Sequence, residues 1–327
     1  MLHKIILPAY LPKKQRKLIS NKANARKIEV DPIVIEVEGY EHRFPILDYR
    51  QKAIPPAQEL FNKALNLMQT PADWANLIRI LSGYRRADRQ FTNANFRTIL
   101  ACAQLSGNMY AVIDALRNVK ASRLHLGTVP RADLVLLNLQ RMALDADYSE
   151  KATRDARTWA LMAHELMEDP AHAKKAAGRP LHREPQVVGQ VLHLAAAQAA
   201  LHQGGKDEGG HVRRLAELLT IVWPEGKGLA SLHEHDIPAD AKPRWRIDFM
   251  RNDDAYLALN VTDRIAIGSF ILHGITLAKQ VVEPELAAKL EPIAQVLRGE
   301  LGEVLKNREN VVAKRGWPVY DKLIAKA

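Results

Sequence analysis

Apolar residues recur every three or four positions through most of the chain from Pro55 onward. This spacing places them on one face of an α-helix. Thr, Pro and acidic residues stand where several of these runs begin, and Gly or Asn where several end, as is typical of helix termini. The pattern predicts helices at about 55–69, 71–87, 92–106, 109–122, 130–146, 148–168, 185–203, 211–223, 253–282 and 284–306. Because the connections are short, neighbouring helices should be antiparallel, and the predicted fold class is all-α.

A different pattern precedes these helices. Between residues 29 and 52 apolar side chains occupy every second position on either side of Gly39. A period of two with glycine at the bend predicts a small β-hairpin. Its alternating residues are Ile33, Ile35, Val37, Tyr40, His42 and Phe44. Two strands alone are marginally stable in water, so the hairpin should pack against the helices or a partner.

The first three helix pairs begin near Pro55, Thr92 and Pro130, which are 37 and 38 residues apart. Repeated pairs at this spacing are typical of an antiparallel helical-hairpin solenoid, in which each pair buries its apolar face against the next. An irregular all-α domain is the alternative. We predict a helical-repeat domain over 53–223, a Pro- and Gly-rich linker over 224–250 and a C-terminal helical unit over 251–327.

Charge is distributed unevenly along the chain. Lys and Arg number 47 against 37 Asp and Glu, which gives a net charge of +10. Residues 1–28 hold eight of the cations and no carboxylate, so the remainder is nearly neutral. A basic N-terminal extension of this kind suits nucleic acid, because closely spaced cations neutralise successive phosphates. A mitochondrial transit peptide and a solvated tail are the alternatives.

The candidate RNA-binding residues follow from this distribution. In the extension they are Lys4, Lys13, Lys14, Arg16, Lys17, Lys22, Arg26 and Lys27. A loop over 169–184 adds Lys174, Lys175, Arg179 and Arg183. Arg244 and Arg246 flank Trp245 in a loop bounded by prolines, where an aromatic ring between two cations suits a base or a phosphate.

Motifs for catalysis or metal binding fail on inspection. His164 and Glu165 lie on a predicted helix, but Glu168 stands where a zinc protease needs its second histidine. The run His233–Asp236 is expected to be a polar loop, since adjacent residues cannot all turn toward one ion. The stretch 224–228 lacks the first glycine and the Ser or Thr of a nucleotide-binding loop. We therefore predict no enzymatic activity, no metal, no cofactor and no small-molecule substrate.

Cysteine content and hydropathy bear on the compartment. Cys102 is the one cysteine, which excludes an intramolecular disulfide and suits a reducing compartment. The most apolar run, Ile265–Ala278, is about fourteen residues long and contains His273. It is shorter than a membrane span, so a buried helix is predicted and no membrane association is expected.

The segment Ala94–Arg123 resembles a pentatricopeptide repeat. The residues that carry the resemblance are Phe96, Ile99, Leu100, Gly107, Val112, Leu116 and Val119. Residues 130–167 look like a second, more degenerate copy whose turn, Asp145–Asp147, lacks glycine. The paired polar positions by which that family reads bases are not assigned.

Degenerate repeats combined with a basic extension and a hairpin look like the helical-repeat proteins of the small subunit of fungal mitochondrial ribosomes. That resemblance implies a structural role in the mitochondrial matrix, with basic residues on ribosomal RNA and helices on neighbouring ribosomal proteins. Two other functions remain open. One is a free pentatricopeptide-like RNA-binding factor in RNA maturation or translation, and the other is an assembly scaffold with a targeting N-terminus.

Overall fold

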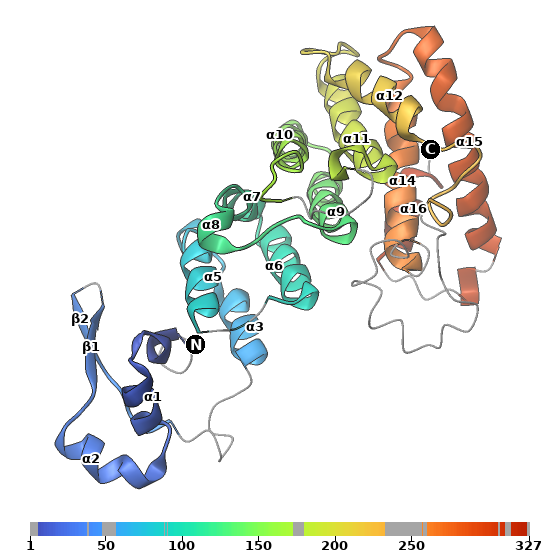
Figure 1. The fold of residues 1–327 in the computed structure, drawn as a ribbon. Helices are drawn as coiled ribbons and strands as arrows, with labels where there is room; N and C mark the ends of the chain where they lie inside the picture. Colours follow the sequence, from blue (N-terminus) through green and yellow to red (C-terminus); the bar gives the residue numbers. More distant parts are fainter. Residues whose placement is uncertain are drawn as a thin grey trace. The chain divides into compact units, whose positions relative to one another are not determined.

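The computed structural model divides after Leu124 into two compact units (Figure 1). Unit 1 comprises residues 1–124 and unit 2 residues 125–327. The structure describes residues 6–37, 39–47, 57–87, 89, 91–172, 180–232, 257, 260–306, 308–310 and 315–325. The division falls inside the predicted repeat domain of 53–223, and most of the predicted linker of 224–250 lies outside the described residues.

The basic extension is helical. It forms a 3-10 turn η2 (Leu7–Tyr10), helix α1 (Lys13–Ile19), a second turn η3 (Lys22–Asn24) and helix α2 (Ala25–Val30). Pro8 and Pro12 prevent one long amphipathic helix in this segment. Pro12 stands just before α1, where its missing N–H costs no hydrogen bond. The alternative of a solvated tail therefore does not describe residues 7–30.

The predicted hairpin is confirmed. Strands β1 (Val34–Val37) and β2 (Tyr40–Arg43) pair antiparallel, with Val37 opposite Tyr40. Gly39 has a φ of +80°, a conformation that glycine adopts without the steric penalty of a Cβ.

The hairpin and the N-terminal helices share a small hydrophobic core. Its buried members are Leu7, Leu11, Ile19, Ile28, Phe44 and Leu47. Backbone hydrogen bonds tie the same segments together, from Leu47 N to Ile19 O and from Phe44 N to Ile33 O. This packing supplies the contacts that two strands need for stability.

The rest of unit 1 is a set of short helices. They are α3 (Ala57–Leu67), α4 (Pro71–Trp74), α5 (Leu77–Arg86), α6 (Asn93–Leu105), α7 (Met109–Arg117) and α8 (Val119–Ser122). Thr70 and Thr92 begin α4 and α6 with capping boxes, which satisfy the first free amides of each helix. The predicted helices at 71–87 and 109–122 are each broken in two.

Hydrogen bonds one helix pair apart join α3 to α6. Asn95 Nδ2 donates to Gln58 Oε1 at 2.7 Å, and Cys102 Sγ donates to Asn66 Oδ1 at 3.3 Å. The residues of these pairs are 37 and 36 positions apart. The first two predicted helix pairs therefore stack in register.

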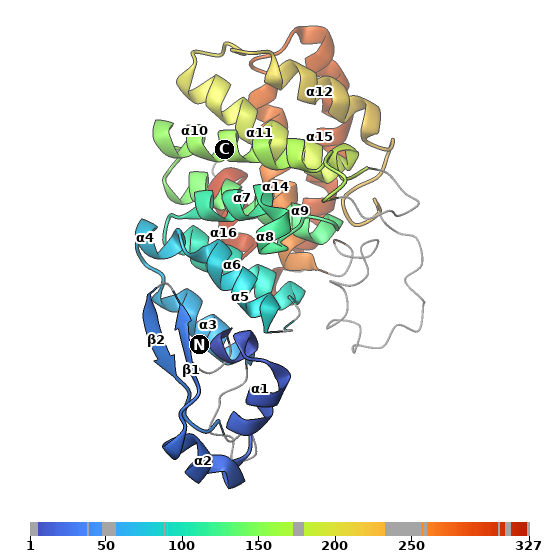
Figure 2. The same cartoon turned by 60° about the vertical axis from the view of Figure 1, so that its left-hand side comes forward.

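Unit 2 is built around two helices that are buried on nearly every side (Figure 1 and Figure 2). They are α11 (Pro185–His202) and α14 (Val261–Ala278). Around them lie α9 (Val129–Asp145), α10 (Glu150–Leu166), α12 (His211–Val222), α15 (Pro284–Lys306) and α16 (Trp317–Leu323), with 3-10 turns η5 (Leu181–Arg183) and η8 (Arg308–Asn310). Since α11 packs on α9, α10, α12 and α14, unit 2 does not follow the neighbour-to-neighbour order of a solenoid, and that prediction is not confirmed.

Glycines let α11 and α14 approach closely. A Cβ at Gly274 would lie 2.5 Å from the Cα of His193, and one at Gly189 would lie 2.9 Å from Cγ2 of Ile271. Within the described part of the chain, α14 is the one helix long and apolar enough to cross a membrane. Most of it is buried in unit 2, as expected for a core helix.

Candidate nucleic-acid interface

One face of α1 carries four of the predicted cations. At about 100° per residue, Lys13, Lys14, Arg16 and Lys17 span roughly 160° of the helix circumference. All four are exposed, whereas Ile19 on the opposite face is buried in the unit 1 core. The fold thus turns the cations outward as one surface.

Neighbouring segments extend this surface. Lys22 in η3 and Arg26 and Lys27 on α2 are exposed, and Ile28 points into the same core as Ile19. We call these seven residues, Lys13, Lys14, Arg16, Lys17, Lys22, Arg26 and Lys27, the α1–α2 cationic surface. Within the described ranges, no carboxylate lies at ion-pair distance from any of them.

The positions of the cations do not favour folding. Lys13 and Lys14 occupy the first turn of α1, where the helix dipole disfavours positive charge, and no acidic residue accompanies them there. Lys13 lies one helical turn from Arg16 and Lys17, so these like charges repel. A polyanion bound at this surface would relieve both effects.

A groove runs beside the cationic surface. It has a volume of about 560 Å³ and a mostly apolar lining that includes Leu18, Val30 and Ile33, and the charged residues Arg26, Lys27 and Asp31 also line it. Val30 is 87% exposed, although it is the last residue of α2 and strongly apolar.

The other predicted RNA-binding residues lie in unit 2 or outside the described residues. Arg183 is exposed in η5 of unit 2. Lys4, Lys174, Lys175, Arg179, Arg244 and Arg246 lie outside the described residues, as does the run His233–Asp236. Their roles stay predictions.

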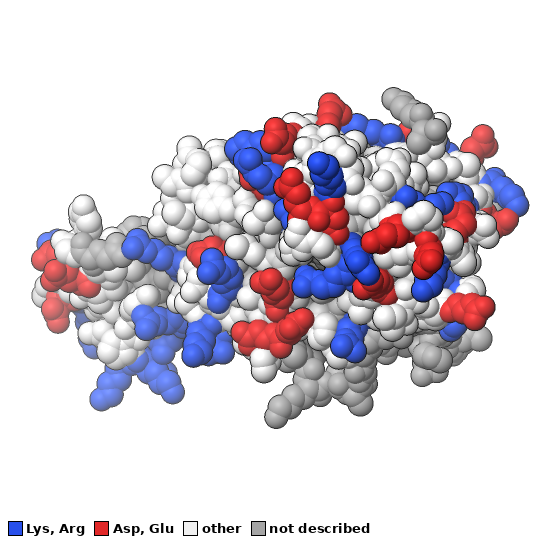
Figure 3. Space-filling view, turned by 90° about the horizontal axis from the view of Figure 1, so that it is seen from above, with Lys and Arg blue, Asp and Glu red and all other residues white. Residues whose placement is uncertain are grey.

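Charges in unit 2 are arranged differently. Figure 3 shows acidic and basic side chains interspersed over unit 2 on the face that it draws. Many of them pair, for example Lys151 with Asp155 at 2.9 Å and Arg308 with both carboxylate oxygens of Asp321. Paired charges of both signs do not attract a polyanion, so the structure separates a cationic unit 1 surface from a mixed unit 2 surface.

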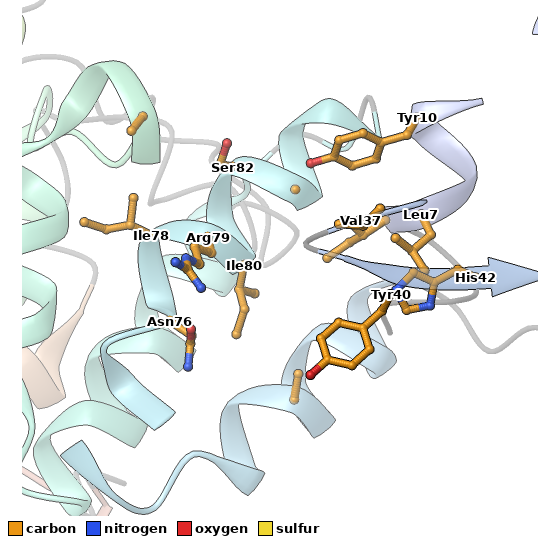
Figure 4. A pocket seen from close by; sticks show the side chains of 14 residues that line it. Leu7, Tyr10, Val37, Tyr40, His42, Asn76, Ile78, Arg79, Ile80 and Ser82 are labelled. Carbon is orange, nitrogen blue, oxygen red and sulfur yellow. The ribbon is translucent and has the colours of Figure 1, made fainter. Parts of the chain in front are cut away.

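Unit 1 also contains a pocket of about 760 Å³ between η2, the hairpin and α5 (Figure 4). Tyr10 and Tyr40 reach across it toward α5, and both are exposed, at 46% and 72%. Arg86 lies over the Tyr10 ring, with 4.4 Å between its guanidinium carbon and the ring centroid. Sequence reasoning missed this pocket, because it assigned Tyr40 only to a strand and considered the extension around Tyr10 only for its charge.

The strongly shifted titratable groups lie in the core of unit 2. His193 Nδ1 accepts from Gln140 Nε2 at 3.1 Å, and its Nε2 lies 3.0 Å from Tyr148 Oη and 3.2 Å from His273 Nδ1. Burial lowers the pKa of His273 to about 4 and lowers that of His193 well below its usual range, so both rings are neutral at pH 7.

A buried carboxyl joins α9 to α11 in the same core. Asp133, the fifth residue of α9, accepts from Gln190 Nε2 at 3.0 Å. Burial first, then the charge of Glu184, raises the pKa of Asp133 well above its usual range. Among residues whose placement the structure gives, no three His, Cys, Asp or Glu side chains converge to hold a metal ion.

These features define a helical protein with a cationic surface on a small folded N-terminal region, a class suited to binding a polyanion. The chain belongs to the family of mitochondrial ribosomal protein mS27, whose family model matches residues 1–322. A curated relative, small ribosomal subunit protein mS27 of Neurospora crassa, is 29% identical over 248 residues. That alignment covers 70% of this chain and 62% of the relative, less than two thirds of the relative's length. The predicted membership in a mitochondrial ribosomal protein family is therefore confirmed.

Proposed function

We propose that this chain is a structural constituent of the small subunit of the mitochondrial ribosome in the mitochondrial matrix. In this proposal the α1–α2 cationic surface lies on ribosomal RNA. The observation that carries it is a set of seven exposed cations on two short helices and the 3-10 turn between them, with no carboxylate partner among the described residues. Phosphate groups would supply the missing counter-charge.

Unit 2 is the part proposed to contact neighbouring ribosomal proteins. Its charges are mixed, and apolar side chains are exposed on its helices, with Ile221 on α12 78% exposed and Leu201 on α11 partly exposed. Protein interfaces combine apolar contacts with a polar rim. A role without catalysis, cofactor or small-molecule substrate fits this arrangement.

The folded extension favours this function over a role as a removable targeting signal. Leu7, Leu11, Ile19 and Ile28 share a core with Phe44 and Leu47. Deleting residues 1–28 would expose that core, and lost binding would then report unfolding as well as lost charge. Substitution of exposed lysines is the cleaner test.

The test compares two variants of the tagged full chain on sucrose gradients of mitochondrial lysate. In the first, Lys13, Lys14, Lys17 and Lys22 are replaced by Gln. In the matched control, the exposed unit 2 lysines Lys151, Lys206, Lys289 and Lys306 are replaced by Gln. We expect the first variant to shift from the small-subunit fractions toward the top of the gradient, more so as salt is raised, and the control to sediment with the parent.

Other results would contradict the proposal. Equal sedimentation of the two variants would show that the cationic surface is not what holds the chain on the particle. Sedimentation of the parent chain with one messenger RNA, away from ribosomal subunits, would favour a free RNA-binding factor. Sedimentation with neither would favour an assembly scaffold.

A further inference from the structure

We propose that the pocket between η2, the hairpin and α5 binds an unpaired RNA nucleotide, with its base stacked on Tyr40 or Tyr10. The proposal rests on the proposed function, since it requires RNA to lie along unit 1, and it adds a second, chemically different contact. The cationic surface would hold the backbone of the RNA, and the pocket would hold one exposed base.

The walls of the pocket are fixed by packing within unit 1. A Cβ at Gly83 on α5 would lie 2.8 Å from Cγ2 of Ile6, so the chain just before η2 lies directly on α5. Arg86, at the end of α5, covers the Tyr10 ring. These two contacts join η2 to α5 on one side of the cavity, whose volume falls within the range of about 300–1,000 Å³ that is usual for small-ligand sites.

The lining matches the chemistry of a base. Leu7, Val37 and Ile80 provide apolar surface, and the tyrosine rings provide stacking faces. Asn76 and Ser82 add groups that can donate to or accept from the edge of a base. Aromatic rings that are left exposed are the usual platforms for unstacked bases of single-stranded RNA.

The charge at the pocket favours an anionic ligand. None of the fourteen described residues that line it is Asp or Glu, and the Arg86 guanidinium stands at its edge over the Tyr10 ring. A nucleotide places a phosphate beside its base, so one ligand can contact both the aromatic rings and the Arg86 guanidinium.

The test uses the purified full chain and two fluorescent probes, a single-stranded RNA of about a dozen nucleotides and an RNA duplex of similar length. Tyr10 and Tyr40 are replaced together by Ala. We expect single-strand binding to weaken by about 10- to 100-fold and duplex binding to stay unchanged, because duplex bases are not available to stack. Tyr110→Ala, on α7 outside the pocket, is the matched control and should bind both probes as the parent does.

Further variants separate stacking from folding and from the proposed function. Tyr40→Phe keeps the ring and should retain single-strand binding. The Gln substitutions of Lys13, Lys14, Lys17 and Lys22 should weaken binding of both probes. If the double Ala variant binds the single-stranded RNA as the parent does, the proposed nucleotide site is wrong, whereas the proposed role of the α1–α2 cationic surface still stands. Ultraviolet crosslinking in isolated particles should attach a nucleotide at Tyr10 or Tyr40. Crosslinks from these two tyrosines to protein and not to RNA would contradict the proposed nucleotide site.

Discussion

The lysines of α1 occupy positions where their positive charges do not stabilise the folded state. Lys13 and Lys14 oppose the dipole of their own helix, and Lys13 repels Lys17 one turn away. Surface residues that oppose local stability are expected at functional sites. The sequence predicted these residues as RNA contacts from their close spacing and from the lack of carboxylates around them, and the structure adds that they share one exposed face.

This conflict predicts opposite effects of one substitution. Lys13→Gln removes charge from the first turn of α1 and ends the repulsion with Lys17. We expect an unchanged or slightly higher melting temperature, measured by circular dichroism, together with weaker RNA binding, measured by anisotropy. Lys151→Gln on α10 is the control, since Lys151 pairs with Asp155 and its loss should leave RNA binding unchanged. A marked drop in melting temperature for Lys13→Gln would assign that lysine a structural role.

A second residue-level prediction concerns the buried histidines. The pKa of His273 is about 4 in the folded chain against an ordinary value near 6.5, so acidification favours the unfolded state, which takes up the proton first. The stability supported by neutral His273 is complete above pH 6.5 and falls as the pH drops toward 4, by up to about 1.4 kcal/mol per pH unit. His193 adds to the effect, and Asp133, whose pKa is raised, opposes it.

The difference between the parent and His273→Gln isolates this contribution. Urea unfolding at several pH values should show a shallower loss of stability for the variant between pH 6.5 and 4. Equal slopes for the two proteins would mean that His273 is protonated in the folded chain.

At the level of elements, the sequence predicted the helices whose apolar residues recur with a regular period. The helices expected at 92–106, 130–146, 185–203, 211–223 and 284–306 match α6, α9, α11, α12 and α15 closely, because each holds an apolar pattern over three or more turns. Helices α1, α2 and α16 were missed. Each is only six or seven residues long, and short helices are stabilised by tertiary packing more than by their own pattern.

The solenoid was inferred from spacing, and spacing does not fix which helices pack together. Stacking at the predicted offset does occur between α3 and α6, through Gln58 and Asn95. In unit 2, however, α11 and α14 are apolar on nearly every face, and they pair with one another as well as with their neighbours in sequence. Helices that are apolar all round become the centre of a bundle.

The crossing of α11 and α14 gives the prediction at this scale. Gly274→Ala would place a methyl group within 2.6 Å of the Cα and Cβ of His193, and backbone cannot move aside easily. We expect a loss of roughly 2–3 kcal/mol in the free energy of unfolding. Gly299→Ala, at an exposed position in α15 where a Cβ meets nothing within 4 Å, should instead stabilise by up to about 1 kcal/mol. Urea denaturation of both variants measures the contrast, and a neutral Gly274→Ala would refute a tight crossing.

At the level of the whole molecule, the uneven charge of the chain becomes a property that salt can measure. Residues 1–28 hold eight cations without a carboxylate, and the structure turns seven of them outward on unit 1. Each cation that neutralises a phosphate releases a counterion, so the binding constant for single-stranded RNA falls with salt at a slope of about 0.7 per contact. Replacing Lys13, Lys14, Lys17 and Lys22 by Gln should therefore reduce the slope of log K against log salt by about 3.

The same four-charge change at Lys151, Lys206, Lys289 and Lys306 should leave the slope unaltered, because those side chains lie on the mixed surface of unit 2. Equal reductions in both variants would show that RNA responds to the net charge of the protein and not to the α1–α2 cationic surface.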